Sequence, residues 1–388
     1  MPRRSLLLPA VAFLLFSAPL ALAQSYVGSG LTTLPLIATT NRYLDNAAWA
    51  INSSGVVAGA SANDLSESYP VSFSNGVLTQ LSLTYGGWAY GINSNGAVVG
   101  EAYFGAGSSH PFVYSAGVMT DLGTLGGENN SAAFGINNSG VVVGYAATAG
   151  GNSFAFSHSG GTMQNLGALG GDYSGARAIN SSGTIVGYAG NASNNDRAFV
   201  YSGGVMSDLG TLGGDTSDAF ALNDAGAIVG VSRNSNGDNH AFAYSGGVMR
   251  DLGTLLGDTS SVARGINASG AVVGYSTDDD DNSRAFYYAN SEMISLNTLF
   301  VGSFSDGATA SGFVSLNYAY GINDSGQIVG SGSYFDLETM NITSRGFALT
   351  VSAVPEPSTY AAILAAAALC AAALRRHRSR VSAARTSA

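Results

Sequence analysis

The chain has 388 residues and a formal net charge of −10 at pH 7. The segment 24–353 holds 8 arginines, no lysine and 24 aspartates plus glutamates, a balance of −16 that excludes nucleic acid and anionic lipid as its partners. The single cysteine, Cys370, lies outside that segment, which excludes disulfides, thiolate nucleophiles and cysteine-ligated metals from it.

Residues 1–23 have the composition of a secretory signal peptide. Two arginines precede a short apolar run at 6–16, and small residues at 21–23 provide a cleavage site. A first transmembrane helix is the alternative, which the shortness of the run and its interruption at Pro9 disfavour. We therefore expect an exported protein whose body spans residues 24–353.

The body is built from repeats of one unit. The phrase GINNSGVVVG at 135–144 has six relatives, and the asparagine at its third position anchors their alignment. The anchors are Asn52, Asn93, Asn137, Asn180, Asn223, Asn267 and Asn323. Consecutive anchors are 41, 44, 43, 43, 44 and 56 residues apart, so seven units follow one another and the last step contains an insertion.

Each unit predicts four short antiparallel strands. The first strand reads A-x-[AG]-[IL]-N and is followed by an N-x-[SA]-G turn of the hairpin type. The second strand is a β-branched run such as 141–144, and the third reads [HR]AFxY, as at 197–201. An SGG turn leads to the fourth strand, which reads VMSDLGTL at 205–212. Glycine is too frequent in the body for helices of useful length.

These units predict an all-β fold, a seven-bladed β-propeller. About 43 residues in four strands is the size of one blade, whereas an open solenoid would need polar capping units, which the sequence lacks. Residues 26–35 resemble a fourth strand without the preceding three, and the last unit ends with a third strand at 345–351. Pairing of these two segments would close the ring and remove both free edges.

The third and fourth strands carry a family resemblance. Residues 240–255, HAFAYSGGVMRDLGTL, resemble the HAF repeats of bacterial extracellular proteins, which implies an extracellular repeat architecture rather than a defined activity. Three other units place arginine where this motif has histidine, and a general base cannot be exchanged for arginine. His110 and His240 are therefore predicted to be structural. The recurring aspartate of the DLG phrase is likewise predicted to hydrogen-bond its glycine-rich turn.

One column of the first strand varies between units and is the candidate ligand-binding set. It reads Trp49, Tyr90, Phe134, Arg177, Phe220, Arg264 and Tyr320, with small residues on either side in every unit. Alternation along a strand places these side chains on one face. Two interpretations are open: packing between blades near the axis, or a ring of aromatics and arginines at the channel mouth that stacks on sugar rings.

Acidic loops are the second variable feature. In a propeller the loops from fourth to first strands and from second to third strands lie on one face, and here they are predicted to hold Asp218, Asp258 and other acids. Oxygen ligands suit Ca²⁺. The candidate ligands are Asp278, Asp279, Asp280, Asp281 and Asp238. A solvated charge run is the alternative, and calcium is the only cofactor that the sequence suggests.

Residues 354–388 form a separate C-terminal segment. A Pro-Glu-Pro triplet precedes an apolar stretch at 360–374, which predicts a transmembrane helix, and arginines follow. The residues that flank the apolar stretch in this pattern are Pro355, Glu356, Pro357, Arg375, Arg376 and Arg378. The pattern resembles the PEP-CTERM sorting signal, which implies an exosortase-type membrane protease as a partner and the arginines on the cytoplasmic side. A permanent single-span anchor is the alternative.

Sequence motifs of common catalytic sites, such as GxSxG, HExxH and the phosphate-binding loop, are absent. We therefore expect a non-catalytic protein of the cell surface or extracellular matrix that binds or scaffolds exopolysaccharide. Its C-terminal helix would anchor it in the inner membrane, transiently or permanently. A propeller glycoside hydrolase or polysaccharide lyase is the alternative, and it would need a carboxylate pair that no other unit shares. A purely structural matrix protein is the third possibility.

Overall fold

The turn between the first and second strands of each unit has the geometry that its sequence predicts. In the third unit the amide of Gly140 donates to the backbone oxygen of Asn137 over 3.0 Å, and the amide of Asn137 donates to that of Val141 over 3.1 Å. Gly140 has a φ of +81°, a conformation that glycine adopts without steric cost. The N-x-[SA]-G phrase is therefore a hairpin turn.

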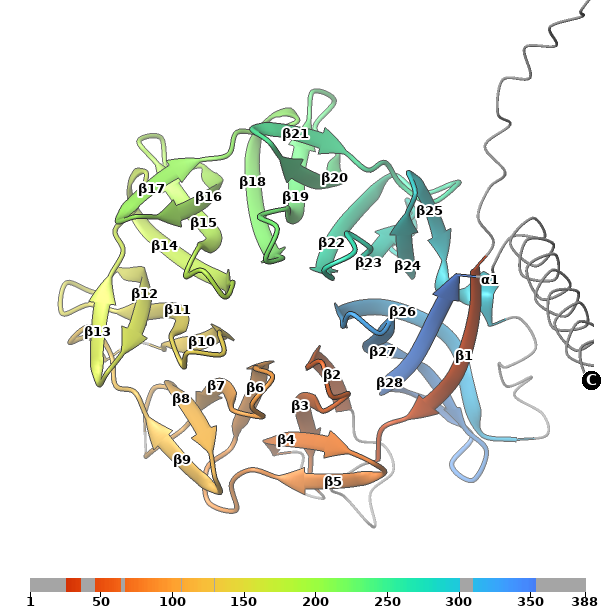
Figure 1. The fold of residues 1–388 in the computed structure, drawn as a ribbon. Coiled ribbons are helices and arrows are strands. Elements are labelled where there is room, and N and C mark those ends of the chain that lie inside the picture. The colour runs from red at the N-terminus through yellow and green to blue at the C-terminus, as the bar shows by residue number, and fades with distance from the viewer. Residues whose placement is uncertain are drawn as a thin grey trace, which may run out of the picture. The chain divides into compact units, whose positions relative to one another are not determined.

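The computed structural model describes residues 26–35, 46–63, 67–105, 107–128, 130–300 and 310–353. The predicted signal peptide and the predicted sorting segment lie outside these residues. Within them, the strands form seven sheets of four strands each, arranged in a ring (Figure 1). Residues of the innermost strands line a central channel. The predicted all-β, seven-bladed β-propeller is confirmed.

The blades are numbered from the first complete sheet in the chain. Blade 1 contains β2 (Asn46–Ile51), β3 (Val57–Ala62), β4 (Ser68–Ser74) and β5 (Val77–Gln80). Blade 2 contains β6 (Gly87–Ile92), β7 (Val98–Ala102), β8 (His110–Ser115) and β9 (Val118–Asp121). Blade 3 contains β10 (Ala132–Ile136), β11 (Val142–Ala147), β12 (Ser153–Ser159) and β13 (Thr162–Asn165). Blade 4 contains β14 (Gly170–Ile179), β15 (Ile185–Asn191), β16 (Asp196–Ser202) and β17 (Val205–Asp208).

The remaining three blades complete the ring. Blade 5 contains β18 (Gly213–Leu222), β19 (Ile228–Asn234), β20 (Asn239–Ser245) and β21 (Val248–Asp251). Blade 6 contains β22 (Ser260–Ile266), β23 (Val272–Thr277), β24 (Ser283–Ala289) and β25 (Glu292–Ser295), and the short helix α1 (Leu296–Leu299) follows it. Blade 7 contains β26 (Gly312–Ile322), β27 (Gln327–Asp336), β28 (Asn341–Ala353) and β1 (Tyr26–Thr33).

Blade 7 joins the two ends of the body. Strand β1, red in Figure 1, lies beside β28, in blue, and supplies the outermost strand of the sheet. The amide of Leu34 donates to the backbone oxygen of Gly346 over 2.9 Å, and the Leu34 side chain is buried. It packs with Ala48 and Val57 of blade 1 and Val329 of blade 7. The N-terminal segment 26–34 therefore contributes β1 to the last sheet and Leu34 to the core beside it.

The hydrophobic core lies between neighbouring blades. Val186 and Ala198 of blade 4 pack in one cluster with Ala219 and Phe242 of blade 5. Each blade from the second to the seventh places one fully buried phenylalanine in such a layer. These residues are Phe112, Phe156, Phe199, Phe242, Phe286 and Phe347. Stability therefore comes from apolar contacts between blades, as expected for a body without disulfides.

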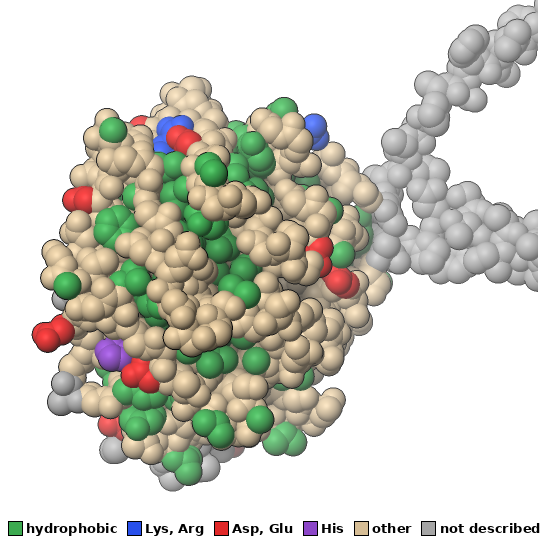
Figure 2. All heavy atoms as spheres, turned by 60° about the vertical axis from the view of Figure 1, so that its left-hand side comes forward, with side chains coloured by type: hydrophobic (Ala, Val, Ile, Leu, Met, Phe, Trp, Pro, Cys, Tyr) green, Lys and Arg blue, Asp and Glu red, His purple; other side chains and the backbone are tan. Residues whose placement is uncertain are grey.

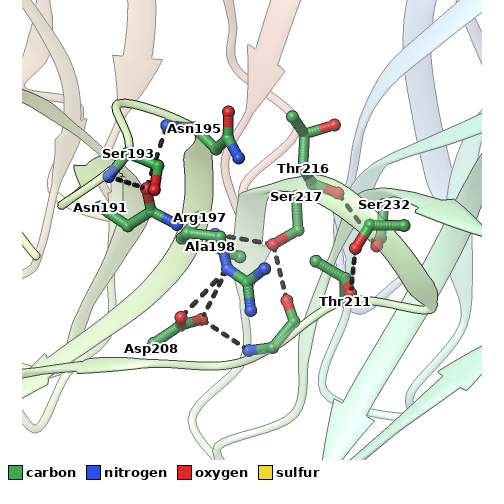
Figure 3. A network of polar contacts seen from close by, with 12 residues as sticks. Asn191, Ser193, Asn195, Arg197, Ala198, Asp208, Thr211, Thr216, Ser217 and Ser232 are labelled. Carbon is green, nitrogen blue, oxygen red and sulfur yellow. Dashed lines mark hydrogen bonds and ion pairs between the residues drawn. The ribbon is translucent and has the colours of Figure 1, made fainter.

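The HAF and DLG phrases meet in the structure. In blade 4 the Arg197 Nε donates to Asp208 Oδ2 over 3.0 Å, while Asp208 Oδ1 accepts from the Gly210 amide over 2.7 Å (Figure 3). His110 and His240 make the same contact with Asp121 and Asp251 at 2.9 and 2.8 Å. The predicted hydrogen bond of the recurring aspartate to its glycine-rich turn is confirmed, and histidine and arginine make the same contact with that aspartate.

A serine of the following blade joins both phrases. The Ser217 hydroxyl of blade 5 accepts from the amide of Ala198 over 2.9 Å and donates to the backbone oxygen of Gly210 over 2.7 Å (Figure 3). Ser174 and Ser261 make the equivalent contacts one blade earlier and one blade later. The repeated DLGT phrase therefore serves to connect blades.

Candidate functional site

A ring of asparagines surrounds one end of the channel. The side-chain Nδ2 of each anchor asparagine donates to the backbone oxygen of the anchor in the next blade, over 3.0 to 3.4 Å. The last of these bonds runs from Asn323 to Asn52 and closes the circle. The sequence interpretation of these residues as turn formers was correct but incomplete, because the bond to the next blade depends on tertiary packing.

The candidate ligand-binding residues occupy a β-bulge in every inner strand. In β10 the pairing with β11 passes from Ala133 directly to Gly135, so that Phe134 has no partner, and the other six inner strands shift register at the same position. A bulge bends its strand and re-aims the extra side chain. Regular alternation, which the sequence predicted, is therefore interrupted at this column.

All seven candidate residues line one cavity in the channel. Its volume is about 420 Å³, which lies within the range of small-molecule sites. The ring residues are Trp49, Tyr90, Phe134, Arg177, Phe220, Arg264 and Tyr320. Ile92, Ile136 and Ile179 also line this cavity and line a second one of about 260 Å³ at the asparagine ring. We call the seven residues the channel ring.

From Trp49 to Arg264, each member of the channel ring contacts the next. The ring centroids of Trp49 and Tyr90 are 5.1 Å apart, and those of Tyr90 and Phe134 are also 5.1 Å apart. The Arg177 guanidinium lies 5.1 Å from the centre of the Phe134 ring and 5.3 Å from that of Phe220. The Arg264 guanidinium lies 4.1 Å from the centre of the Phe220 ring. Both aromatic pairs and both arginines lie within the usual range of stacking and cation–π contacts. These contacts hold the side chains in place before any ligand arrives.

Arg177 is paired with a carboxylate that the sequence placed in a loop. Its Nη2 donates to Asp218 Oδ2 over 3.1 Å, and its guanidinium lies 4.8 Å from the Tyr188 ring. Asp218 belongs to strand β18, two residues before Phe220, so its prediction as an acidic loop residue was wrong. Burial raises the pKa of Asp218 to about 6, against the opposing effect of Arg177 and Arg264.

Glu101 is a second carboxylate that sequence reasoning missed. The Tyr90 hydroxyl donates to Glu101 Oε1 over 2.7 Å, and the Ser109 hydroxyl donates to Oε2 over 2.6 Å. Burial and, to a smaller extent, Glu101 raise the pKa of Tyr90 well above its usual value. A signal was present in the sequence, since Glu101 follows VVG where the other units have Ala, Tyr, Val or Ser.

We expect Asp218 to make stability depend on pH between about 4 and 6. The folded protein keeps a proton on Asp218 up to about pH 6, whereas the unfolded chain releases it near 3.8, so stability falls as the pH rises through this window. The unmodified protein should therefore lose stability relative to Asp218→Asn over that range. Urea unfolding of both proteins at pH 4, 5, 6 and 7 measures this.

The control for this measurement is Asp215→Asn, which removes the same charge from a more exposed position of β18. It should follow the pH profile of the unmodified protein. A stability difference between the unmodified protein and Asp218→Asn that is constant, or that changes in the opposite direction, would contradict the expected role of Asp218.

The acidic residues proposed for calcium take part in turn contacts. Asp278 Oδ1 accepts from the amides of Asp280 and Asn282 over 3.0 and 2.9 Å, as Asn234 accepts in the corresponding turn of blade 5. The hydrogen bond from the Asn282 backbone is the main cause that lowers the pKa of Asp278. Within the described ranges, no group of three His, Cys, Asp or Glu side chains is arranged to hold a metal. Calcium binding stays a prediction.

Two further acids that the sequence assigned to loops have arginine partners, and one of them, Asp215, lies in strand β18 instead. Asp258, whose side chain is fully buried, pairs with Arg284, and Asp215 lies 3.6 Å from Arg233. On the face shown in Figure 2 the acidic side chains lie in separate small groups. These ion pairs relieve the repulsion that a cluster of carboxylates would produce. The sorting-signal residues lie outside the described residues, and no helix in the described part is long and apolar enough to span a membrane.

Comparison with known proteins finds structures of similar fold but identifies no family for this chain. No protein-family model matches the chain, and no curated protein matches it. A puromycin-hydrolyzing peptidase of Mycobacterium tuberculosis is similar in structure, with a TM-score of 0.50 and 11% identity over 78% of this chain and 53% of the peptidase. The chain thus spans about half the length of that enzyme.

Two further solved structures are similar at lower scores. TolB from Acinetobacter baumannii has a TM-score of 0.43 and 13% identity, covering 64% of this chain and 62% of TolB. A six-bladed lectin from Aleuria aurantia has a TM-score of 0.35 and 9% identity, covering 84% of this chain and 98% of the lectin. At 11% identity, the similarity to the peptidase shows the fold alone. The fold and the site together define a seven-bladed propeller with an aromatic and arginine ring in its channel.

Proposed function

We propose that the protein is an exported, non-catalytic propeller that binds carbohydrate through the channel ring and serves as a scaffold for extracellular polysaccharide. The observation that supports this most directly is the convergence of all seven ring residues on one cavity. Five of them are aromatic, and they present flat apolar faces that suit the CH faces of a sugar. Cavities of this size with a few convergent polar groups are the usual form of a binding site.

The channel ring is suited to binding because it is already ordered. Tyr90 contacts both Trp49 and Phe134, and the bulges that carry these three residues belong to inner strands rather than to loops. Aromatic side chains have few rotatable bonds, so little conformational entropy is lost on contact with a ligand. A site built on strands also holds its geometry better than a site on loops.

The alternative function is a propeller glycoside hydrolase or lyase. Its acid and base would be Glu101 and Asp218, the carboxylates that contact ring residues and recur in no other blade. They belong to β7 and β18, on opposite sides of the channel (Figure 1). Each is engaged by a neighbour, Glu101 by Tyr90 and Asp218 by Arg177, which supports structural roles for both.

The test is binding and turnover on the same glycans. We expect the purified body to bind members of an oligosaccharide array and to leave them intact over hours. Turnover of a bound glycan would establish the enzyme alternative. The absence of binding to every glycan would leave the purely structural matrix role.

Within that test, Trp49→Ala should weaken glycan binding about tenfold, since one aromatic contact contributes about 0.5–1.5 kcal/mol beyond its buried area. The matched control is Trp88→Ala, because Trp88 packs on Tyr103, with ring centroids 6.1 Å apart, and does not line the ring cavity. Equal loss of affinity in both variants would contradict binding in the channel. Isothermal titration of one array-positive oligosaccharide provides the measurement.

Export and membrane processing belong to the same proposal. The resemblance of the tail to a PEP-CTERM signal and of the repeats to HAF units supports a surface or matrix location in a bacterium that exports polysaccharide. The mature mass of the chain in a host with an exosortase distinguishes a cleaved tail from a permanent anchor.

A further inference from the structure

The channel ring has two chemically different arcs. The ring members of blades 7, 1, 2 and 3 are Tyr320, Trp49, Tyr90 and Phe134, which are all aromatic. In blades 4, 5 and 6 two guanidiniums, those of Arg177 and Arg264, flank Phe220. One half of the cavity therefore presents apolar ring faces, and the other half presents positive charge.

The two arginines differ in their partners. Arg177 is hydrogen-bonded to Asp218, which neutralises and orients it. Arg264 contacts the Phe220 and Tyr275 rings at 4.1 and 6.0 Å. Among the described residues its guanidinium has no hydrogen-bond or ion-pair partner, whereas that of Arg177 has one; the buried Nε is unsatisfied in both arginines. The Asp218 carboxylate therefore interacts electrostatically with the guanidiniums of both Arg177 and Arg264.

An unpaired guanidinium in a cavity indicates an anionic ligand. A buried N–H without a partner costs free energy, which a carboxylate recovers by forming charge-assisted, often bidentate hydrogen bonds. The body as a whole has a charge of −16, so general attraction of anions to its surface is not the reason for this arrangement. The positive charge is local to the ring.

Organic cations are the other class that aromatic rings attract. Quaternary ammonium groups bind by cation–π contacts within about 6 Å of ring faces. Here the two guanidiniums already lie at that distance from Phe134 and Phe220, and their charge would repel a second cation. The ring therefore favours a ligand that is both flat on one side and anionic.

From these observations we infer that the channel ring selects acidic sugars, with Arg264 binding the carboxylate of a uronate residue while the aromatic arc stacks on its ring. This inference rests on the proposed carbohydrate-binding function and specifies its ligand class. Arg177 has a structural role in the ring. It is hydrogen-bonded to Asp218, packs between Phe134 and Phe220, and does not contact the sugar carboxylate.

The test compares trigalacturonate with its trimethyl ester, which has the same sugar rings and linkages but no charge, by isothermal titration against the body. The unmodified protein should bind the acid about 10- to 150-fold more tightly than the ester, as expected for one added charge-assisted hydrogen-bonded pair. Arg264→Gln should bind both with the affinity of the ester. Arg264→Lys, which keeps the charge without the planar fork, should retain part of the preference.

The matched control is Arg250→Gln, which removes an exposed arginine of β21, outside the cavity, and should leave the preference unchanged. Tricarballylate, which has three carboxylates and no sugar ring, should not compete with trigalacturonate at equal concentration. Competition at equal strength would overturn the sugar part of the inference, because any carboxylate would then suffice.

The remaining outcomes separate this inference from the function that it extends. Equal affinity for acid and ester in the unmodified protein overturns the selection of acidic sugars and leaves carbohydrate binding intact. A preference that survives in Arg264→Gln overturns the role of Arg264. Failure to bind either trisaccharide, together with a negative glycan array, overturns the proposed function itself.

Discussion

Replacing Gly144 by alanine is expected to destabilise the protein by about 3 kcal/mol or more, the upper range for forcing extra atoms into a packed site. A Cβ on Gly144 would lie 1.9 Å from the backbone oxygen of Ala132 and 2.8 Å from the Cα of Ala133. Both are backbone atoms, so no side chain can move aside. The bulge at Phe134 forces this close approach, and the VVG glycine accommodates it.

Urea unfolding with the transition midpoint as the readout measures the effect. The control is Gly105→Ala, since a Cβ there meets no atom within 4 Å and the residue has no positive φ. That variant should change stability by less than about 0.5 kcal/mol. If the two alanine variants unfold at the same urea concentration, the bulge is not what requires glycine in this column.

Leu34→Ala is expected to cost about 2–5 kcal/mol, the range for removing a buried leucine side chain. Only 4% of Leu34 is exposed, and it packs against both the first and the last blade. Deletion of residues 26–35 should cost more, because it also removes the strand beside β28 and exposes an unpaired edge.

The position of the damage is as informative as its size. In the deletion variant, amide exchange should accelerate first in β28 and β2, and last in β15 on the far side of the ring (Figure 1). Leu83→Ala is the control, since 86% of Leu83 is exposed. Uniform loss of protection around all seven blades would mean that β1 adds general stability without a specific part in closure.

The asparagine ring links the seven separate sheets to one another at one end of the channel. Each anchor accepts bonds within its own turn and donates one bond to the next blade, as with Asn93, whose Oδ1 accepts from Ala97 and whose Nδ2 reaches Asn137. The anchors are buried, so an unsatisfied amide there would be costly. This explains why every unit retains asparagine at this position.

Much of the fold was predictable because the chain contains seven versions of one unit. Comparison of the seven units distinguishes residues that recur in every blade from residues that vary between blades. The N-x-[SA]-G turns, the VVG strands and the DLG aspartates recur, and the structure gives each of them a structural contact. The variable column, from Trp49 to Tyr320, was recognised as the candidate site for the same reason, and the structure brings its members together around one cavity.

The sequence by itself determined the number of blades, their four-stranded make-up and the ring positions, because these depend on periodicity and on turn chemistry within about 43 residues.

Tertiary structure alone decided the bulges, the contacts between blades and the partners of the ring arginines. The bulge that turns Phe134 into the channel arises from pairing of β10 with β11, and no local pattern marks it. Asp218 reaches Arg177 from 41 residues away, and Asn323 reaches Asn52 from 271, because adjacent blades pack at a fixed distance. Arg264 was visible in the sequence as a basic residue, but the absence of a partner for it in the described structure depends on how the blades meet.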